Sequence, residues 1–308
     1  MPNCNLILDS CCDLPAEMLQ RDGIFLLKFP YILDGQSYDD DLYQSTTAKD
    51  FYNAMRKGAE PSTSQVSIPV FTEIFTEAID TGLPTVYLSF TSGLSASYDV
   101  ALMVRDQVLA EHPGAELYVV DTRLASVAEG LFVYEAMRQW EKGLTAKELA
   151  DWAEEARYFI DCEFMIEDLD TLRRGGRISG TVAMAGAALD VKPLLTIDRD
   201  GKLTLSGMAR GRKKGIKQLA DYYFKNENNS GPLHTVCIGN ADCPKDAERL
   251  KELLLKEDEN LFIIESSIGP VIGSHVGPGM LAIVFWGRDK RENLSVADRI
   301  SRKMRGAK

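Results

Sequence analysis

Short apolar runs alternate with longer segments of helical periodicity through the first half of the chain. Three runs, Asn5 to Leu8, Thr85 to Phe90 and Glu116 to Val120, have the length and the aliphatic content of buried strands. The segment from Ser67 to Ile79 instead repeats its apolar residues at helical spacing. Strands that alternate with helices form a parallel sheet covered on both faces. We therefore predict an α/β/α domain over residues 1–160.

Helix start signals agree with this prediction. Thr47 precedes Asp50 by three residues, as in a capping box, and predicts a helix from Thr47. Asp13 can cap a helix whose first turn contains Pro15. The other helices predicted in this half follow the Thr91–Ser95 loop through Val108, cover Ser126 to Trp140, and cover Thr145 to Tyr158.

The second half has a different pattern. Val191 to Ile197 and Leu203 to Leu205 flank the turn signal Asp198-Arg199-Asp200-Gly201, which predicts an antiparallel hairpin. Further strands are expected at residues 233–239, 261–266 and 280–286, with helices at 213–224 and 245–256. We predict a mixed or antiparallel α/β domain over residues 161–308. A chain of 308 residues exceeds the usual size of one core, and ligands bind in the cleft between two domains.

Charge and composition narrow the function. Lys and Arg number 35 against 46 Asp and Glu, a net charge of -11, which disfavours binding to nucleic acid and to anionic membranes. No apolar run approaches 18 residues, so we expect a cytoplasmic protein without stable membrane insertion. The three histidines, His112, His234 and His275, lack metal-ligand spacing, and we expect no metal and no cofactor.

Three hydroxyl-rich segments each precede a predicted helix: Thr63 to Ser67, Thr91 to Ser95, and Asp121-Thr122. Backbone N–H groups at helix starts, with Ser and Thr donors beside them, can bind an anion such as a carboxylate. Each segment could equally do no more than cap its helix. Their recurrence in one domain favours an anion site.

Three further segments have open interpretations. The Gly- and Pro-rich stretch Ile268 to Gly279 predicts a rigid loop around His275, which is either structural or a hydrogen-bond partner of a ligand. The basic segment Asp170 to Gly180 lacks the ending of a nucleotide-phosphate loop, and the apolar helix predicted over Val182 to Leu189 suits a core or a cavity wall. The basic run comprises Arg210, Arg212, Lys213, Lys214 and Lys217, and is either a solvated face or a docking patch for an acidic or phosphate-bearing partner.

Taken together, these motifs resemble the DegV family from end to end. The resemblance rests on Ile7-Leu8-Asp9-Ser10 with Cys12-Asp13-Leu14-Pro15, on Thr63-Ser64-Gln65, on Ser92-Gly93-Leu94-Ser95, on Asp170 to Ser179, on Lys192-Pro193-Leu194-Leu195, and on Ile268 to Gly279. It implies a two-domain DegV-like fold with a ligand between the domains.

The resemblance also implies a function. It is that of the binding subunit of a fatty acid kinase, which holds a long-chain fatty acid and presents its carboxylate to the partner kinase for phosphorylation to an acyl phosphate. The chain would then be an accessory lipid-binding subunit in phospholipid metabolism and no enzyme itself. The expected fatty-acid-binding residues are Thr63, Ser64, Ser92, Gly93, Ser95, Arg177 and His275, and the expected docking residues are Arg210, Arg212 and Lys213.

A serine hydrolase or esterase is the alternative. Gly93-Leu94-Ser95-Ala96-Ser97 approaches the Gly-x-Ser-x-Gly elbow and lies between a predicted strand and helix. Ser95 would be the nucleophile and His275 the base. Ser97 in place of the second glycine departs from that motif.

Overall fold

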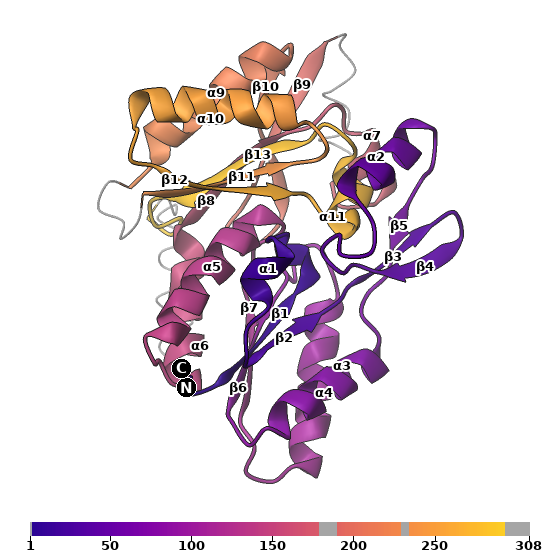
Figure 1. Cartoon of the computed structure of the whole chain (residues 1–308), viewed down its shortest axis with the longest axis vertical. Helices are drawn as coiled ribbons and strands as arrows, with labels where there is room; N and C mark the ends of the chain where they lie inside the picture. The colour runs from indigo at the N-terminus through magenta and orange to yellow at the C-terminus, as the bar shows by residue number, and fades with distance from the viewer. Residues whose placement is uncertain (1, 179–189, 229–233, 293–308) are drawn as a thin grey trace.

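The computed structural model describes residues 2–178, 190–228 and 234–292. Two large β-sheets, one from each half of the chain, form the centre of the molecule, and a small third sheet lies beside them (Figure 1). The mixed α/β class with one parallel and one mixed sheet is therefore confirmed. The apolar helix predicted over Val182 to Leu189 lies outside the described residues.

The first sheet is fully parallel, with strand order β2-β1-β6-β7. The central strands β1 and β6 are buried along their whole length, which is why their sequences read as continuous apolar runs. The bounds are β1 (Asn5–Asp9), β2 (Ile24–Leu27), β6 (Thr85–Ser89) and β7 (Leu117–Asp121).

Helices lie on both sides of this sheet, with α3 and α4 on one side and α5 and α6 on the other (Figure 1). The helix predicted from Thr47 is confirmed as α2, and the Thr47 side chain accepts a hydrogen bond from Asp50 N–H. The helical bounds are α1 (Ala16–Leu19), α2 (Ala48–Arg56), α3 (Ile68–Ile79), α4 (Ser97–Glu111), α5 (Val127–Glu141), α6 (Ala146–Ala156) and the 3-10 turns Ser10–Cys12 and Arg157–Phe159.

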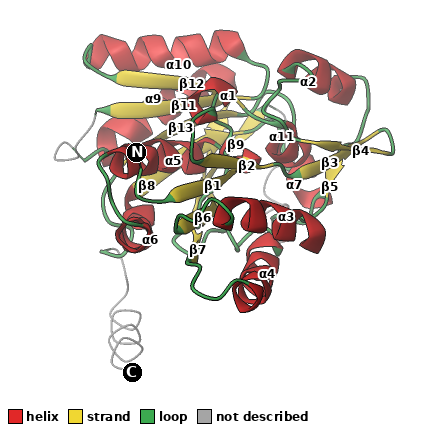
Figure 2. Cartoon of the chain, turned by 60° about the horizontal axis from the view of Figure 1, so that its bottom comes forward, coloured by secondary structure: helices red, strands yellow, loops and turns green. Residues whose placement is uncertain are grey.

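A small antiparallel sheet was missing from the sequence prediction. It has the order β4-β3-β5 and stands out beside α2 and α3 (Figure 2). Its strands β3 (Pro30–Leu33), β4 (Gln36–Asp39) and β5 (Ser62–Thr63) are only two to four residues long. Thr63 pairs with Tyr31, so this sheet fixes the start of the Thr-Ser-Gln segment.

The second sheet has the order β10-β9-β8-β13-β11-β12 and is mixed, because only β11 and β12 are parallel. Helices α9 and α10 cover one face and α5 of the first half packs against the other (Figure 1). The bounds are β8 (Ile160–Met165), β9 (Val191–Ile197), β10 (Leu203–Arg210), β11 (Thr235–Asn240), β12 (Phe262–Ser267), β13 (Leu281–Trp286), α7 (Asp170–Arg174), α9 (Arg212–Asn226), α10 (Pro244–Glu257) and α11 (Pro270–Val276).

The predicted hairpin is confirmed. Strands β9 and β10 pair in antiparallel register from Leu203 opposite Ile197, and Gly201 takes the positive φ of +75° that the turn needs. Its tip touches the first half, where Thr91 Oγ1 donates to Gly201 O at 3.1 Å. The hairpin therefore joins the two halves of the molecule.

Two local predictions were wrong. Asp13 does not cap α1: it has left-handed φ and ends the 3-10 turn Ser10–Cys12, and α1 begins after Pro15 without a side-chain cap. The stretch Ile268 to Gly279 is not all loop, because α11 forms within it and starts at Pro270, a residue suited to the first helical turn. Gly273 lets α11 pack closely, since a Cβ there would lie 2.5 Å from the Tyr52 hydroxyl oxygen.

Candidate functional site

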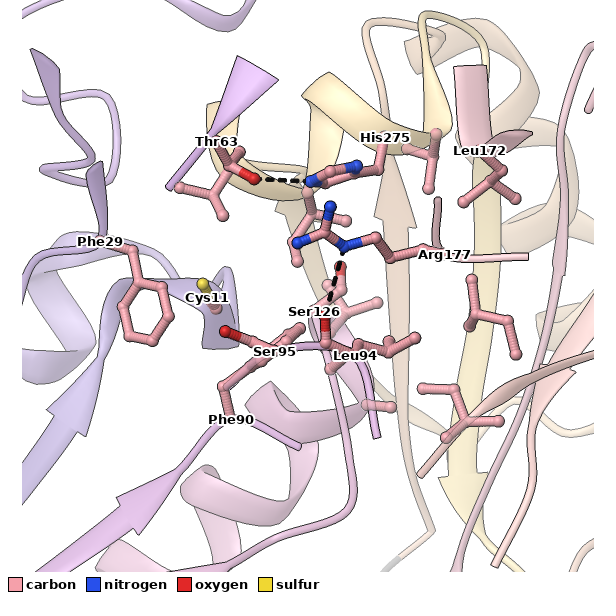
Figure 3. A pocket seen from close by; sticks show the side chains of 18 of the residues that line it. Cys11, Phe29, Thr63, Phe90, Leu94, Ser95, Ser126, Leu172, Arg177 and His275 are labelled. Atoms are coloured by element: carbon pink, nitrogen blue, oxygen red, sulfur yellow. Dashed lines mark hydrogen bonds between the residues drawn. The ribbon is translucent and has the colours of Figure 1, made fainter. Parts of the chain in front are cut away.

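A cavity of about 240 Å³ lies where the two halves meet. Its walls are mainly aliphatic and aromatic, with a few hydroxyls, two thiols, one arginine and one histidine (Figure 3). The lining residues of the first half include Cys11, Phe29, Thr63, Ser64, Gln65, Phe90, Leu94, Ser95, Ser126 and Ala128, and those of the second half include Cys162, Phe164, Leu172, Arg177, Ile197, Leu203, Ile272, His275, Ala282 and Val284.

Strand β13 supplies one apolar wall through the alternation of its side chains. Ala282 and Val284 face the cavity, whereas Ile283 and Phe285 pack into a separate apolar cluster beneath α9 and α10. This two-residue period follows from the pleat of a strand. The same strand therefore builds the core of the second half and the wall of the site.

The polar groups of the cavity gather in one place (Figure 3). Thr63 Oγ1 lies 2.8 Å from His275 Nε2, so a hydroxyl of the first half meets an imidazole of the second. Arg177 reaches the same area and donates from Nε to Leu94 O at 3.3 Å and from Nη1 to Gly175 O at 2.5 Å. Ser95, next to Leu94, completes the group.

His275 is uncharged at neutral pH. Burial and the positive charge of Arg177 lower the pKa of His275 from 6.5 to about 4. Within the part of the chain that the structure describes, its Nδ1 has no hydrogen-bond partner. Gly175 packs against this side of the ring, where an added Cβ would lie 2.3 Å from Nδ1. Gly175 thus allows the imidazole to sit where it reaches Thr63.

Two of the predicted binding residues lie outside the cavity wall. Ser92 turns toward Asp121, which accepts from Ser92 N–H at 3.1 Å and from Ser92 Oγ at 2.6 Å. Gly93 packs on the hairpin tip, where a Cβ would lie 2.5 Å from Gly201 O. Both residues hold the loop that carries Ser95, while Thr63, Ser64, Ser95, Arg177 and His275 line the cavity.

The hydrolase geometry is not assembled. Ser95 Oγ bonds Ser97 Oγ at 3.0 Å, and His275 Nε2 bonds Thr63, so the two expected catalytic groups have other partners. In a triad, a carboxylate orients the histidine through its second nitrogen. Among the described residues, no side chain occupies that position at His275 Nδ1.

Ser126 and a group of carboxyls behind it were missed by the sequence reasoning. Ser126 lines the cavity and donates from Oγ to Asp13 Oδ2 at 2.5 Å, while Asp13 Oδ1 accepts from Gly269 N–H at 2.9 Å. Ser266 Oγ also donates to the backbone oxygen of Asp13. Asp13 therefore joins the cavity wall of the first half to the start of α11. The Asp-Leu-Pro motif was the available signal.

Four buried carboxyls form this acidic cluster: Asp9, Asp13, Asp40 and Glu129. Burial raises the pKa of Asp9 and of Asp40 to about 7, and it raises the pKa of Asp13 and of Glu129 well above the ordinary range. Neighbouring negative charges within the cluster add to these shifts. No metal-binding group of His, Cys, Asp or Glu occurs among the described residues.

The predicted docking residues differ from one another in the structure. Arg210 and Lys213 are exposed at the end of β10 and the start of α9, but the Arg212 guanidinium pairs with Glu167 at 2.5 Å and with Asp246 at 2.6 Å. These bonds attach α9 to α10 and to the segment after β8. Arg212 is thus part of an internal ion-pair network.

Comparison with known proteins gives the family. A family model described as "Uncharacterised protein, DegV family" matches residues 3–288. The chain belongs to the DegV family. A DegV domain-containing protein of Clostridium perfringens is 38% identical over 285 residues, which cover 92% of this DegV-family chain and 98% of the relative. The family resemblance drawn from the sequence motifs is confirmed.

Solved DegV structures share the fold. A Thermotoga maritima protein, reported to reveal a fatty acid binding function, has a TM-score of 0.79 and 26% identity, covering 94% of the present DegV-family chain and 100% of its own. A Thermus thermophilus DegV family protein, reported for its fatty acid binding, has a TM-score of 0.77 and 27% identity over 94% and 100% of the two chains. Among the described residues, no helix combines the length and hydrophobicity needed to span a bilayer.

Proposed function

We propose that this protein is a cytoplasmic carrier that binds a long-chain fatty acid in the cavity and presents its carboxylate to a partner fatty acid kinase. The kinase would transfer a phosphoryl group to the carboxylate and form an acyl phosphate. The carrier supplies no catalytic residue in this scheme. One observation carries the proposal: an apolar cavity has its polar side chains Thr63, Ser95, Arg177 and His275 gathered in one area.

The sizes of the two free-energy contributions show what the apolar walls and the polar groups of such a cavity would each do. Burying about 14 methylene groups at ~0.8 kcal/mol each favours binding by about 11 kcal/mol, before the cost of immobilising the chain. A hydrogen bond to the charged head adds only about 1.5–3 kcal/mol. The apolar walls would therefore supply affinity, and the polar group would decide which end of the ligand faces it.

The polar group suits a carboxylate. His275 is neutral, so its Nε2 hydrogen can point to Thr63 Oγ1, which leaves the Thr63 hydroxyl hydrogen for the ligand. Arg177 supplies the compensating positive charge, and its bonds to the carbonyls of Leu94 and Gly175 hold the guanidinium in place. Ser95 adds a second hydroxyl.

The test is mass spectrometry of the intact protein purified gently and without detergent. We expect one long-chain fatty acid per chain, lost on organic extraction and regained on incubation with the free acid. Extracted protein should not react with a fluorophosphonate probe for active-site serines. A lipid-free protein that takes up no fatty acid, or covalent labelling of Ser95, would contradict the proposal.

Kinase docking through Arg210 and Lys213 has its own test. Both side chains are exposed, and rim charges act mainly on association rate and orientation. We expect Arg210→Glu to raise the carrier concentration needed for half-maximal kinase activity several-fold at low ionic strength, with unchanged lipid content. Lys225→Glu, an exposed charge reversal at the other end of α9, is the matched control. If Arg210→Glu and Lys225→Glu require the same carrier concentration for half-maximal kinase activity, the docking surface lies elsewhere.

A further inference from the structure

Ser97 joins two segments of the proposed carboxylate site although it does not line the cavity. It is the first residue of α4 and only 1% exposed. Its Oγ accepts from Val66 N–H at 3.3 Å and lies 3.0 Å from Ser95 Oγ, while its N–H donates to Ser95 Oγ at 3.2 Å. One hydroxyl therefore connects the Thr63–Val66 segment to the loop that carries Ser95.

The two segments have different anchors elsewhere. Thr63 is held by strand pairing with Tyr31 and by its bond to His275, whereas the Ser95 loop is held by the bond between Ser92 and Asp121. At Ser97 the two segments are bonded to a common oxygen. The separation of the Thr63 and Ser95 hydroxyls, which must both reach one carboxylate, depends on this contact.

We propose that Ser97 is a positioning residue for carboxylate recognition and acts through Ser95 without touching the ligand. This inference rests on the proposed function, because it assigns a role within that same site. A hydroxyl offers one hydrogen and two lone pairs. When Ser95 turns its hydrogen toward a carboxylate, Ser97 can donate its own hydrogen to Ser95 Oγ and still accept from Val66 N–H. The bridge therefore survives ligand binding and polarises the Ser95 hydroxyl toward the negative charge.

If Ser97 positions Ser95, its loss should affect recognition of the carboxylate and leave binding of the acyl chain unchanged. Removing the Ser97 hydroxyl leaves the apolar walls in place, so a ligand without a charged head should bind almost as before. A fatty acid should lose the contribution of a correctly placed Ser95. The informative quantity is the ratio of affinities for palmitate and for 1-hexadecanol, which share the same chain length.

The experiment measures both dissociation constants on delipidated full-length protein. We expect the wild type to favour palmitate, S97A to lower that preference about 10-fold with hexadecanol affinity changed less than about twofold, and S97T to retain the preference because it keeps the hydroxyl. S97C nearly preserves the volume of serine but offers a weak hydrogen-bond group, so it should lose preference as S97A does. S67A, at an exposed N-cap without a side-chain hydrogen bond, is the control beside Val66.

The outcomes distinguish two failures. An S97C protein with unchanged preference, or an S97A protein that loses palmitate and hexadecanol affinity by the same factor, would overturn the positioning role and leave the proposed function standing. A wild-type protein that binds hexadecanol as tightly as palmitate would overturn the carboxylate site itself. S97C and S97T keep the test decisive even if S97A fails to fold.

Discussion

Phenylalanine in place of Ala282 is expected to lower fatty acid affinity at least 100-fold. Ala282 is 3% exposed and faces the cavity from β13, so the added ring occupies space that the acyl chain needs. Excluding about four methylene groups at ~0.8 kcal/mol each removes about 3 kcal/mol, which corresponds to a factor of about 100 or more. The change should be visible as loss of copurified lipid and as a weaker dissociation constant for palmitate.

Ala209→Phe is the matched control for this prediction. Ala209 is equally buried, but it lies in the apolar cluster beneath α9 and α10, away from the cavity. Overpacking there should cost about 1–3 kcal/mol of folding stability while lipid binding persists. The ring at position 282 can enter the cavity and should destabilise the empty protein less. If Ala282→Phe keeps its lipid at full stoichiometry, the cavity is not the lipid site.

Asp40→Asn should stabilise the protein at pH 8 by up to about 4 kcal/mol. Asp40 is buried within the acidic cluster, and burial raises its pKa from 3.8 to about 7. Above that pH the folded protein must hold an unfavourable buried charge, a penalty of at most ~4 kcal/mol at 1.36 kcal/mol per pKa unit. Asparagine is neutral and can still accept the hydrogen bond that Leu42 N–H donates to Asp40 Oδ1 at 3.0 Å.

The pH dependence follows from the same shift. Between pH 3.8 and about 7 the folded Asp40 retains a proton that the unfolded chain has lost, so its contribution to stability is complete at low pH and falls as pH rises. The raised pKa of Asp9 likewise makes the protein less stable as pH rises. The pKa of His275 is lowered to about 4, so its contribution to the stability of the protein is lost as pH falls below 6.5. The contributions of Asp9 and His275 to the pH dependence are the same in the variant and in the wild type, so they cancel when the two proteins are compared at one pH.

Urea unfolding at pH 5 and pH 8 provides the measurement. The free energy of unfolding of Asp40→Asn should exceed that of the wild type mainly at pH 8. Asp39→Asn, the same charge change at the adjacent exposed residue, should show no such gain. If the two variants are alike at both pH values, the cluster does not hold Asp40 in an unfavourable charged state.

The central strands of the parallel sheet were predictable because they are buried on both faces and therefore read as unbroken apolar runs, whereas its edge strand β2 was missed. Strand β8 was missed too, because Asp161 and Glu163 interrupt its pattern. Tyr222 donates to Asp161 at 2.7 Å and Ser206 donates to Glu163 at 2.7 Å, so hydroxyls brought by other elements satisfy both carboxylates. These partners are distant in the sequence, so a short segment around β8 does not reveal them.

The site shows a similar division. Motif resemblance identified the Thr63, Ser95 and His275 segments, which meet in the structure. It could not tell which hydroxyl of Ser92 and Ser95 faces the cavity, since that depends on Asp121 at the end of a neighbouring strand. It also missed Asp13 as a link between the two halves, because its partner Gly269 is 256 residues away.

Gly93, Gly175 and Gly201 carry no functional group, yet each marks a position where another part of the protein takes up the room of a side chain. Gly93 and Gly201 meet backbone to backbone, and Gly175 leaves room for the His275 ring. In a library of random substitutions these three positions should tolerate as little variation as Thr63 or His275. A side chain at either Gly93 or Gly201 would push the halves apart, so no single replacement at one can be repaired by shrinking the other. Substitutions that fail at these glycines would show that the positions must lack a side chain. They would not show that the glycines contact the ligand, so they should not be used to locate the binding site.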